Sequence, residues 1–216
     1  MSTNSREAIL QRIRSGLDQG ALPMPFPEDA ATPLATPFAD KSGDGLELQF
    51  AQAFTALGGK FIYCGSHTEL VQNLDLLIDQ TDWKDVLCAE PEWLRLFQES
   101  KMEHIRIAHP RHESADACIT GCESLVARTG SIILSSRQTL GRIGPVYWPV
   151  HIVIAYAWQL TPDIGDALTG LLEHTGDKLP SMINLNTGPS RTADIEKTLV
   201  VGVHGPKEVY CFFVNH

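Results

Sequence analysis

A Gly-Pro turn in the C-terminal part of the chain leads directly into a run of polar side chains. Residues 187–206 read TGPSRTADIEKTLVVGVHGP. Free backbone N–H groups at such a turn, together with a guanidinium, can bind a small carboxylate or phosphate. We therefore predict a small-anion site built from Gly188, Ser190, Arg191 and Thr192. A capped junction explains the same residues without a ligand, because Ser190 or Thr192 can cap a helix that begins there.

His204 lies near the end of this segment and completes its part of the predicted site. The sequence predicts a helix after Thr192 that ends before Gly205, because glycine suits the left-handed position after a helix and Pro206 prevents continuation. His204 is then either a C-terminal cap or an acid or base, since imidazole titrates near neutral pH. Both interpretations stay open.

Two more polar segments flank a predicted buried strand, SIIL. The loop before this strand presents hydroxyl and N–H groups from Thr129, Gly130 and Ser131. The loop after it carries two guanidiniums that suit a carboxylate or phosphate, those of Arg137 and Arg142. We add these residues to the predicted ligand site. A structural turn and a surface loop explain the two segments almost as well.

The motifs of common cofactor and metal sites are absent from the sequence. It has no CxxC series for an iron–sulfur cluster, no GxxxxGK[ST] phosphate loop, no GxGxxG and no HExxH. Cys118 and Cys122 have the spacing CxxxC, with no second pair nearby to complete a metal site. We therefore assign no cofactor and no metal. The five cysteines are odd in number and mostly lie in apolar segments, so we expect reduced, buried thiols.

The charge and the apolar content restrict the partners. A formal net charge of -9 and a pI of about 5.3 argue against nucleic acid, because binding its backbone requires clustered Lys and Arg. A small anion can still bind locally at a turn or a helix N-terminus. The start of the chain lacks the apolar region of a signal peptide, and no stretch approaches the ~18 apolar residues of a membrane helix. We expect a cytoplasmic protein without a membrane span.

The apolar periodicity predicts an α/β fold in two parts. Residues 1–45 indicate an amphipathic helix, capped by Asn4, and a Pro-rich arm. The apolar side chains of the arm suit docking either on the domain itself or on a neighbouring subunit of a homo-oligomer. Residues 46–216 alternate helical stripes with short apolar runs, which is typical of βα units around a mostly parallel sheet flanked by helices. The last run, Val209–Val214, is apolar throughout, so we expect it inside the sheet.

Three of these segments resemble a known family. ARTGSIILSS, WPVHIVIA and above all TGPSRTADIEKTLVVGVHGP are similar to the LUD domain of the lactate-utilisation protein C family. The similarity covers roughly Gly121 to the C-terminus, whereas the earlier βα units match in pattern only. It implies an α/β fold of the sugar-phosphate isomerase and CoA-transferase type. The family usually reads Ala-Glu-Thr-Gly-Thr where residues 127–131 are Ala-Arg-Thr-Gly-Ser, so a carboxylate role is not carried over to that loop.

The resemblance implies a function in lactate metabolism. It implies an accessory or assembly subunit in the oxidation of L-lactate to pyruvate, together with iron–sulfur partner proteins, and does not imply that this chain transfers the electrons. The alternative is a stand-alone enzyme or a sensor that binds a small anionic metabolite: a sugar phosphate, an acyl-CoA or a hydroxy acid. Glu123 is the nearest counterpart in this sequence of the covalent glutamate of CoA-transferases.

Overall fold

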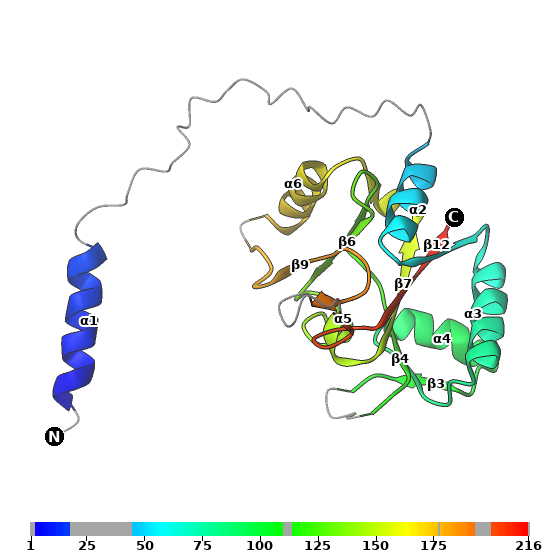
Figure 1. The fold of residues 1–216 in the computed structure, drawn as a ribbon, viewed down its shortest axis with the longest axis horizontal. Coiled ribbons are helices and arrows are strands. Elements are labelled where there is room, and N and C mark those ends of the chain that lie inside the picture. The colour runs from blue at the N-terminus through cyan, green and yellow to red at the C-terminus, as the bar shows by residue number, and fades with distance from the viewer. Residues whose placement is uncertain (1–2, 18–44, 110–113, 177, 193–199, 216) are drawn as a thin grey trace. The chain divides into compact units, whose positions relative to one another are not determined.

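The computed structural model describes residues 3–17, 45–109, 114–176, 178–192 and 200–215 (Figure 1). The chain divides into two units, Met1–Ser42 and Gly43–His216. In the first unit, helix α1 (Thr3–Leu17) confirms the predicted N-terminal helix, although it begins before Asn4, the residue that we predicted as its cap. The predicted Pro-rich arm falls almost entirely on residues 18–44, which lie outside the described residues.

A parallel sheet of six strands forms the centre of the second unit. Its strands are β1 (Lys60–Cys64), β2 (Val86–Cys88), β3 (Ile105–Ile107), β4 (Ala117–Thr120), β7 (Val150–Tyr156) and β12 (Glu208–Val214). They lie in the order β1-β12-β7-β4-β2-β3, and every neighbouring pair is parallel. The predicted α/β fold with a mostly parallel sheet is therefore confirmed. Strand β12 is buried from Val209 to Val214 between β1 and β7, as its apolar run predicts.

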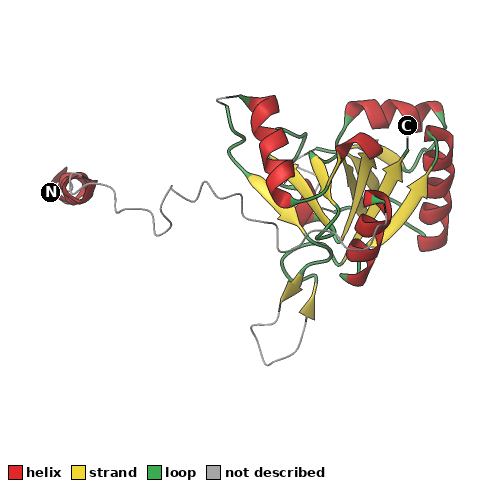
Figure 2. Cartoon of the chain, turned by 90° about the horizontal axis from the view of Figure 1, so that it is seen from above, coloured by secondary structure: helices red, strands yellow, loops and turns green. Residues whose placement is uncertain are grey.

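Helices cover both faces of this sheet (Figure 2). On one face lie α3 (His67–Thr81) and α4 (Pro91–Glu99), whose apolar sides form one core with the strands. On the other face, α2 (Leu46–Ala56) packs through Phe50 and Phe54, and the short α5 (Gly144–Tyr147) lies over β4 and β7. None of the helices in the described part of the chain combines the length and the apolar character that a membrane crossing needs.

A second, smaller sheet lies beside α2. It has the order β8-β5-β6-β9, with strands β5 (Ser124–Val126), β6 (Ser131–Ser135), β8 (Leu160–Thr161) and β9 (Ile183–Asn186). Leu125, Ile132 and Leu134 join the core that α2 shares with the parallel sheet. The opposite side, at Val126 and Ile133, is covered by α6 (Ile164–Thr175). A short 3₁₀ helix, η1 (Ala157–Gln159), connects β7 to β8.

A two-stranded ribbon takes the place of the described parts of the predicted C-terminal helix. Strand β10 (Arg191–Thr192) pairs antiparallel with β11 (Val200–Val201). The helix prediction was therefore wrong at both ends, and residues 193–199 between them lie outside the described residues. Thr192, Val200 and Val201 are β-branched and favour extended backbone, and the pairing supplies the hydrogen bonds that a helix would have given.

Candidate functional site

The predicted Thr-Gly-Ser turn lies against α2. Thr129 Oγ1 donates to Ser131 Oγ at 2.8 Å, and Ser131 Oγ lies 3.0 Å from Thr187 Oγ1. Gly130 has a φ of 61°, and a Cβ at this position would overlap the backbone of α2. Only glycine allows both the left-handed conformation and this approach. The turn thus holds α2 against the second sheet.

The Gly-Pro turn docks at the C-terminal end of the same helix. Gly188 is buried with a φ of 88°, and a Cβ there would come 3.1 Å from the carbonyl oxygen of Leu57. The Arg191 guanidinium donates to this same carbonyl oxygen. The N–H of Ser190 donates to the carbonyl oxygen of Pro206 at 2.9 Å. A cation at a helix C-terminus satisfies a free carbonyl and is favoured by the helix dipole, so these residues act as a clamp on α2.

Thr192 and His204 follow this clamp along the chain. The backbone of Thr192 pairs with that of Val200 in the β10–β11 ribbon. His204 is exposed in the loop between β11 and β12, so the first of its two interpretations, a cap at a helix C-terminus, does not hold. The next residue, Gly205, lies close to Ser190, since a Cβ at Gly205 would come 2.9 Å from the Ser190 Cβ. The loop with His204 therefore lies beside the clamp.

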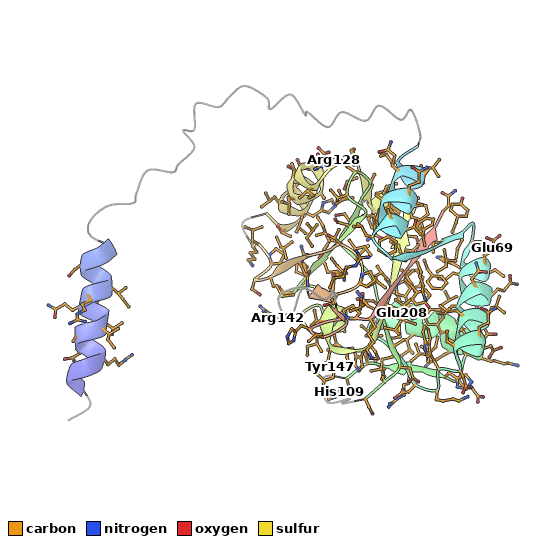
Figure 3. All side chains as sticks on the ribbon, viewed as in Figure 1. Glu69, His109, Arg128, Arg142, Tyr147 and Glu208 are labelled. Atoms are coloured by element: carbon orange, nitrogen blue, oxygen red, sulfur yellow. The ribbon has the colours of Figure 1, made fainter. Side chains whose placement is uncertain are left out.

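The two predicted loop arginines lie at the other end of the β6–β9 pair. Because the two strands are antiparallel, Ser131 lies near the end of β9, whereas Ser135 pairs with its first residue. Arg137 lies two residues after Ser135, and Arg142 donates to Ser181 Oγ at 2.5 Å. Figure 3 shows Arg142 and Arg128 at opposite ends of the second sheet. At ~3.3 Å per strand residue, the length of β6 separates the predicted residues into two groups.

A cleft of about 490 Å³ opens between the start of β5, η1 and α6. Its volume falls within the roughly 300–1,000 Å³ of small-molecule sites. The residues that line it are Cys122, Glu123, Ser124, Arg137, Gln138, Trp158, Gln159, Thr161, Asp166, Ala167, Gly170, Leu171 and His174. Two of the lining segments, residues 122–124 and 158–161, follow the carboxyl ends of β4 and β7, which is where open α/β sheets bind ligands. Of the predicted ligand-site residues, Arg137 lines this cleft, and so does Glu123, the nearest counterpart of the covalent glutamate of CoA-transferases.

Ser135 organises the polar wall of the cleft. Its buried Oγ donates to Glu123 Oε1 and accepts the backbone N–H of Arg137 at 3.1 Å. Its own N–H donates to Gln138 Oε1 at 2.9 Å. The carboxylate and the amide are thereby fixed. Within the described residues, the guanidinium of Arg137 has no acceptor, so it is the group of this wall that can bind an anion.

Gln159 connects the ends of the two strands that form the cleft. Its Nε2 donates to the carbonyl oxygen of Cys122 at 2.5 Å, and its Oε1 accepts the backbone N–H of Tyr156 at 2.8 Å. The side chain is 9% exposed, so both bonds are protected from water. They fix η1, and the preceding residue, Trp158, projects into solvent with 72% of its surface exposed.

A half-buried acid, Glu90, lies next to this wall, at the carboxyl end of β2. Burial raises the pKa of its carboxyl, although the backbone of Gly121 and the side chain of Thr139 form hydrogen bonds with it. One carboxyl oxygen, Oε1, is buried and has no hydrogen-bond partner among the described residues. An unpaired buried carboxylate oxygen is costly, so this position favours a bound proton or a polar ligand atom.

The cysteines are all buried, as the sequence predicts. Burial raises the pKa of the Cys88 thiol to about 12, and it raises the pKa of Cys122, in the wall of the cleft, as well. These thiols are protonated near neutral pH and are poor nucleophiles. Across the described residues, no three His, Cys, Asp or Glu side chains are arranged to hold a metal ion.

Glu90, Trp158 and Gln159 are not among the site residues predicted from the sequence. Each follows closely after a buried apolar run: Glu90 after VLC, and the other two after HIVIAY. In a parallel sheet, polar and aromatic residues at this place lie at the ligand-binding edge. A search for such residues at the carboxyl ends of predicted strands would have found all three.

Comparison with known proteins identifies relatives of the second unit. Residues 48–214 match the family model of the LUD domain. A lactate utilization protein C of Bacillus licheniformis is 38% identical over 98 residues, which cover 44% of this chain and 41% of the relative. The protein of the same name from Bacillus subtilis is 38% identical over 105 residues, 48% of this chain and 44% of the relative. The chain thus matches less than half the length of these relatives.

One solved structure has a similar fold. The crystal structure of a DUF162 family protein from Deinococcus radiodurans superposes with a TM-score of 0.57 and covers 78% of this chain and 96% of its own chain. The sequences are 20% identical, so the similarity concerns the fold alone. It supports the α/β architecture described above.

Proposed function

Since the chain belongs to the LUD domain family, we propose that it acts in lactate utilisation, as an accessory or assembly subunit in the oxidation of L-lactate to pyruvate beside iron–sulfur partner proteins. The observation that carries the proposal is the family match over residues 48–214, together with relatives called lactate utilization protein C. The proposal leaves the electron transfer itself to the partner proteins.

We propose that the chain binds a small anion as part of this role and that the anion binds in the cleft. The guanidinium of Arg191 already donates to the Leu57 carbonyl oxygen, whereas that of Arg137 has no acceptor among the described residues. A carboxylate at Arg137 would gain charge-assisted hydrogen bonds. Glu123 and Asp166 line the same cleft and would repel a second negative group. The cleft therefore suits a ligand with one anionic end.

Growth on lactate tests the role. Deleting the gene in its host should impair growth with L-lactate as the carbon source and leave growth on glucose unchanged, and the full chain should restore growth on lactate. Arg137→Ala should restore it poorly. Arg95→Ala, at an exposed arginine of α4, is the matched control and should restore it fully. Normal growth of the deletion strain on lactate would overturn the proposal.

Purification tests the partners. The tagged full chain, isolated anaerobically from lactate-grown cells, should carry proteins with the absorption of iron–sulfur clusters. If the purified chain carries no iron–sulfur proteins although the cells still require it for growth on lactate, the assembly role is refuted. The role in lactate utilisation then remains.

The cleft and its available guanidinium favour a second candidate, a stand-alone enzyme or sensor for a small anionic metabolite. A ligand at 100 times its Kd adds about 2.7 kcal/mol of apparent stability, so thermal shifts with L-lactate, ribose 5-phosphate and acetyl-CoA test this candidate. Turnover of a shifting ligand would identify an enzyme, and a shift without turnover would identify a sensor. No shift with any of the three would remove the candidate.

A further inference from the structure

Three aromatic rings form a stack that leads from the core to the cleft. Trp93, 4% exposed on α4, stacks on Tyr156 with 5.4 Å between ring centroids and 30° between planes. Tyr156 stacks in turn on Trp158, at 5.9 Å and 17°. The ring of His67 lies edge-on to Trp93 and Tyr156, and its Nε2 is 3.2 Å from the Tyr156 hydroxyl. Tyr156 is therefore fixed, and it supports one face of Trp158.

Trp158 offers the cleft a largely exposed ring. Trp158 lines the cleft, and it is the most exposed of the large apolar side chains among the described residues. The hydrogen bonds of Gln159 fix the backbone of Trp158, and the ring of Tyr156 supports the ring of Trp158. A ligand that stacks on Trp158 would therefore restrict little additional motion of this side chain. A flat ring gains most from such a surface, because stacked aromatic rings bury large areas at a defined spacing.

The size and the charge of the cleft fit a ligand larger than a three-carbon acid. A volume of about 490 Å³ leaves most of the space empty around lactate. Ala167 and Leu171 provide an apolar part of the wall, and Arg137 provides the cation. The cleft thus combines a stacking surface, an apolar wall and one anion-binding group.

We propose that this cleft binds a nucleotide-like ligand, in which a flat heterocycle stacks on Trp158 and a phosphate binds to Arg137. The proposal rests on the proposed function only in using the same anion-binding arginine. It adds a ligand class that neither the LUD match nor the names of the relatives contain.

AMP and its two halves test the proposal. Binding to the full chain is measured by isothermal titration with AMP, with adenosine, which keeps the ring, and with ribose 5-phosphate, which keeps the phosphate. AMP should bind more tightly than either half and should quench tryptophan fluorescence. Trp158→Ala should weaken AMP and adenosine binding by about 5- to 150-fold, the range for stacking of one base on an aromatic side chain, and leave ribose 5-phosphate unchanged. Trp158→Phe should retain most of the affinity.

Arg137→Ala should show the opposite selectivity, weakening AMP and ribose 5-phosphate but not adenosine. Tyr147→Ala, at an exposed aromatic residue of α5 outside the cleft, is the matched control and should change none of them. Equal affinity for AMP and ribose 5-phosphate would refute the stacking of the heterocycle on Trp158 and leave only the anion site at Arg137. The proposal would be overturned if none of the three probes binds. It would also be overturned if the Trp158→Ala variant binds AMP normally but loses a protein partner. In each of these cases the growth test on lactate still decides the proposed function separately.

Discussion

Acidification should destabilise this protein through His151, a buried histidine of β7. Its side chain is 0% exposed, and burial lowers the pKa of the imidazole to about 4 from 6.5. Nε2 lies 2.8 Å from Thr120 Oγ1, and that hydroxyl donates to the Gly121 carbonyl oxygen, so Nε2 carries the proton and the hydroxyl accepts it. Nδ1 is buried without a partner among the described residues. Protonation would place a second buried N–H there with no acceptor, which is costly.

The magnitude follows from the difference between the two pKa values. Well above pH 6.5 the imidazole is neutral in both the folded and the unfolded chain, and its protonation does not affect the free energy of unfolding. As the pH falls below 6.5, the imidazole of His151 binds a proton in the unfolded chain, whereas in the folded chain it stays neutral until about pH 4. A difference of ~2.5 pH units at 1.36 kcal/mol each gives a loss of about 3 kcal/mol by pH 4. Between pH 7 and pH 5 the loss is about 2 kcal/mol.

Urea unfolding at pH 7 and pH 5 measures this loss. His151→Gln keeps an amide donor for Thr120 but cannot titrate, so its free energy of unfolding should fall by about 2 kcal/mol less than that of the wild type. His104→Gln, at an exposed histidine, is the control and should follow the wild type. If the wild type and His151→Gln lose the same free energy between the two pH values, the buried imidazole does not govern the acid response.

Three further predictions concern the stability and reactivity of the fold. Gly130→Ala should lower the free energy of unfolding by about 1–3 kcal/mol, because the added Cβ meets the backbone of α2 at a positive φ. Gly165→Ala, with open space around it, should not lower it, and equal urea midpoints of the two variants would refute the close contact between the Thr-Gly-Ser turn and α2. Asp163→Ala should lower the free energy of unfolding by about 1 kcal/mol, because the carboxylate accepts the first N–H of α6 at 2.6 Å and pairs with Arg128. Asp163→Asn keeps the cap and should lower it less. The reverse order of the two variants in urea unfolding would contradict the capping role. All five buried thiols should react with Ellman's reagent only after unfolding, and rapid reaction of the native protein would contradict their burial.

The parallel sheet could be predicted because its central strands are buried on both faces. Such strands are apolar at nearly every position, and the run Val209–Val214 showed this clearly. Strand β4 (Ala117–Thr120) was missed, although it borders the cleft. Its four residues are too few for a periodic pattern, and its strand conformation depends on pairing with β2 and β7, which lie far from it in the sequence.

The predicted C-terminal helix failed for a related reason. Caps and turn residues around Thr192 satisfy the local rules for a helix, but the observed backbone partner of Thr192 is Val200 in an antiparallel ribbon. Tertiary pairing overrides such local preferences. For the same reason the sequence could offer single residues at strand ends but not the cleft that they form, because Glu123 and Trp158 meet only through the neighbouring places of β4 and β7 in the sheet.

The residues that carry the family resemblance and the residues that line the cleft are largely different, and the structure provides a physical reason. A clamp on the end of α2 needs a left-handed glycine at Gly188 and a guanidinium at Arg191, three positions later, so it leaves a recognisable motif. The cleft takes Glu123, Arg137 and Trp158 from separate segments and leaves no local motif. Because substitutions at these wall residues would not disturb the clamp, proteins that share the motif can differ in what they bind. The ligand of this chain must therefore be established from its own cleft.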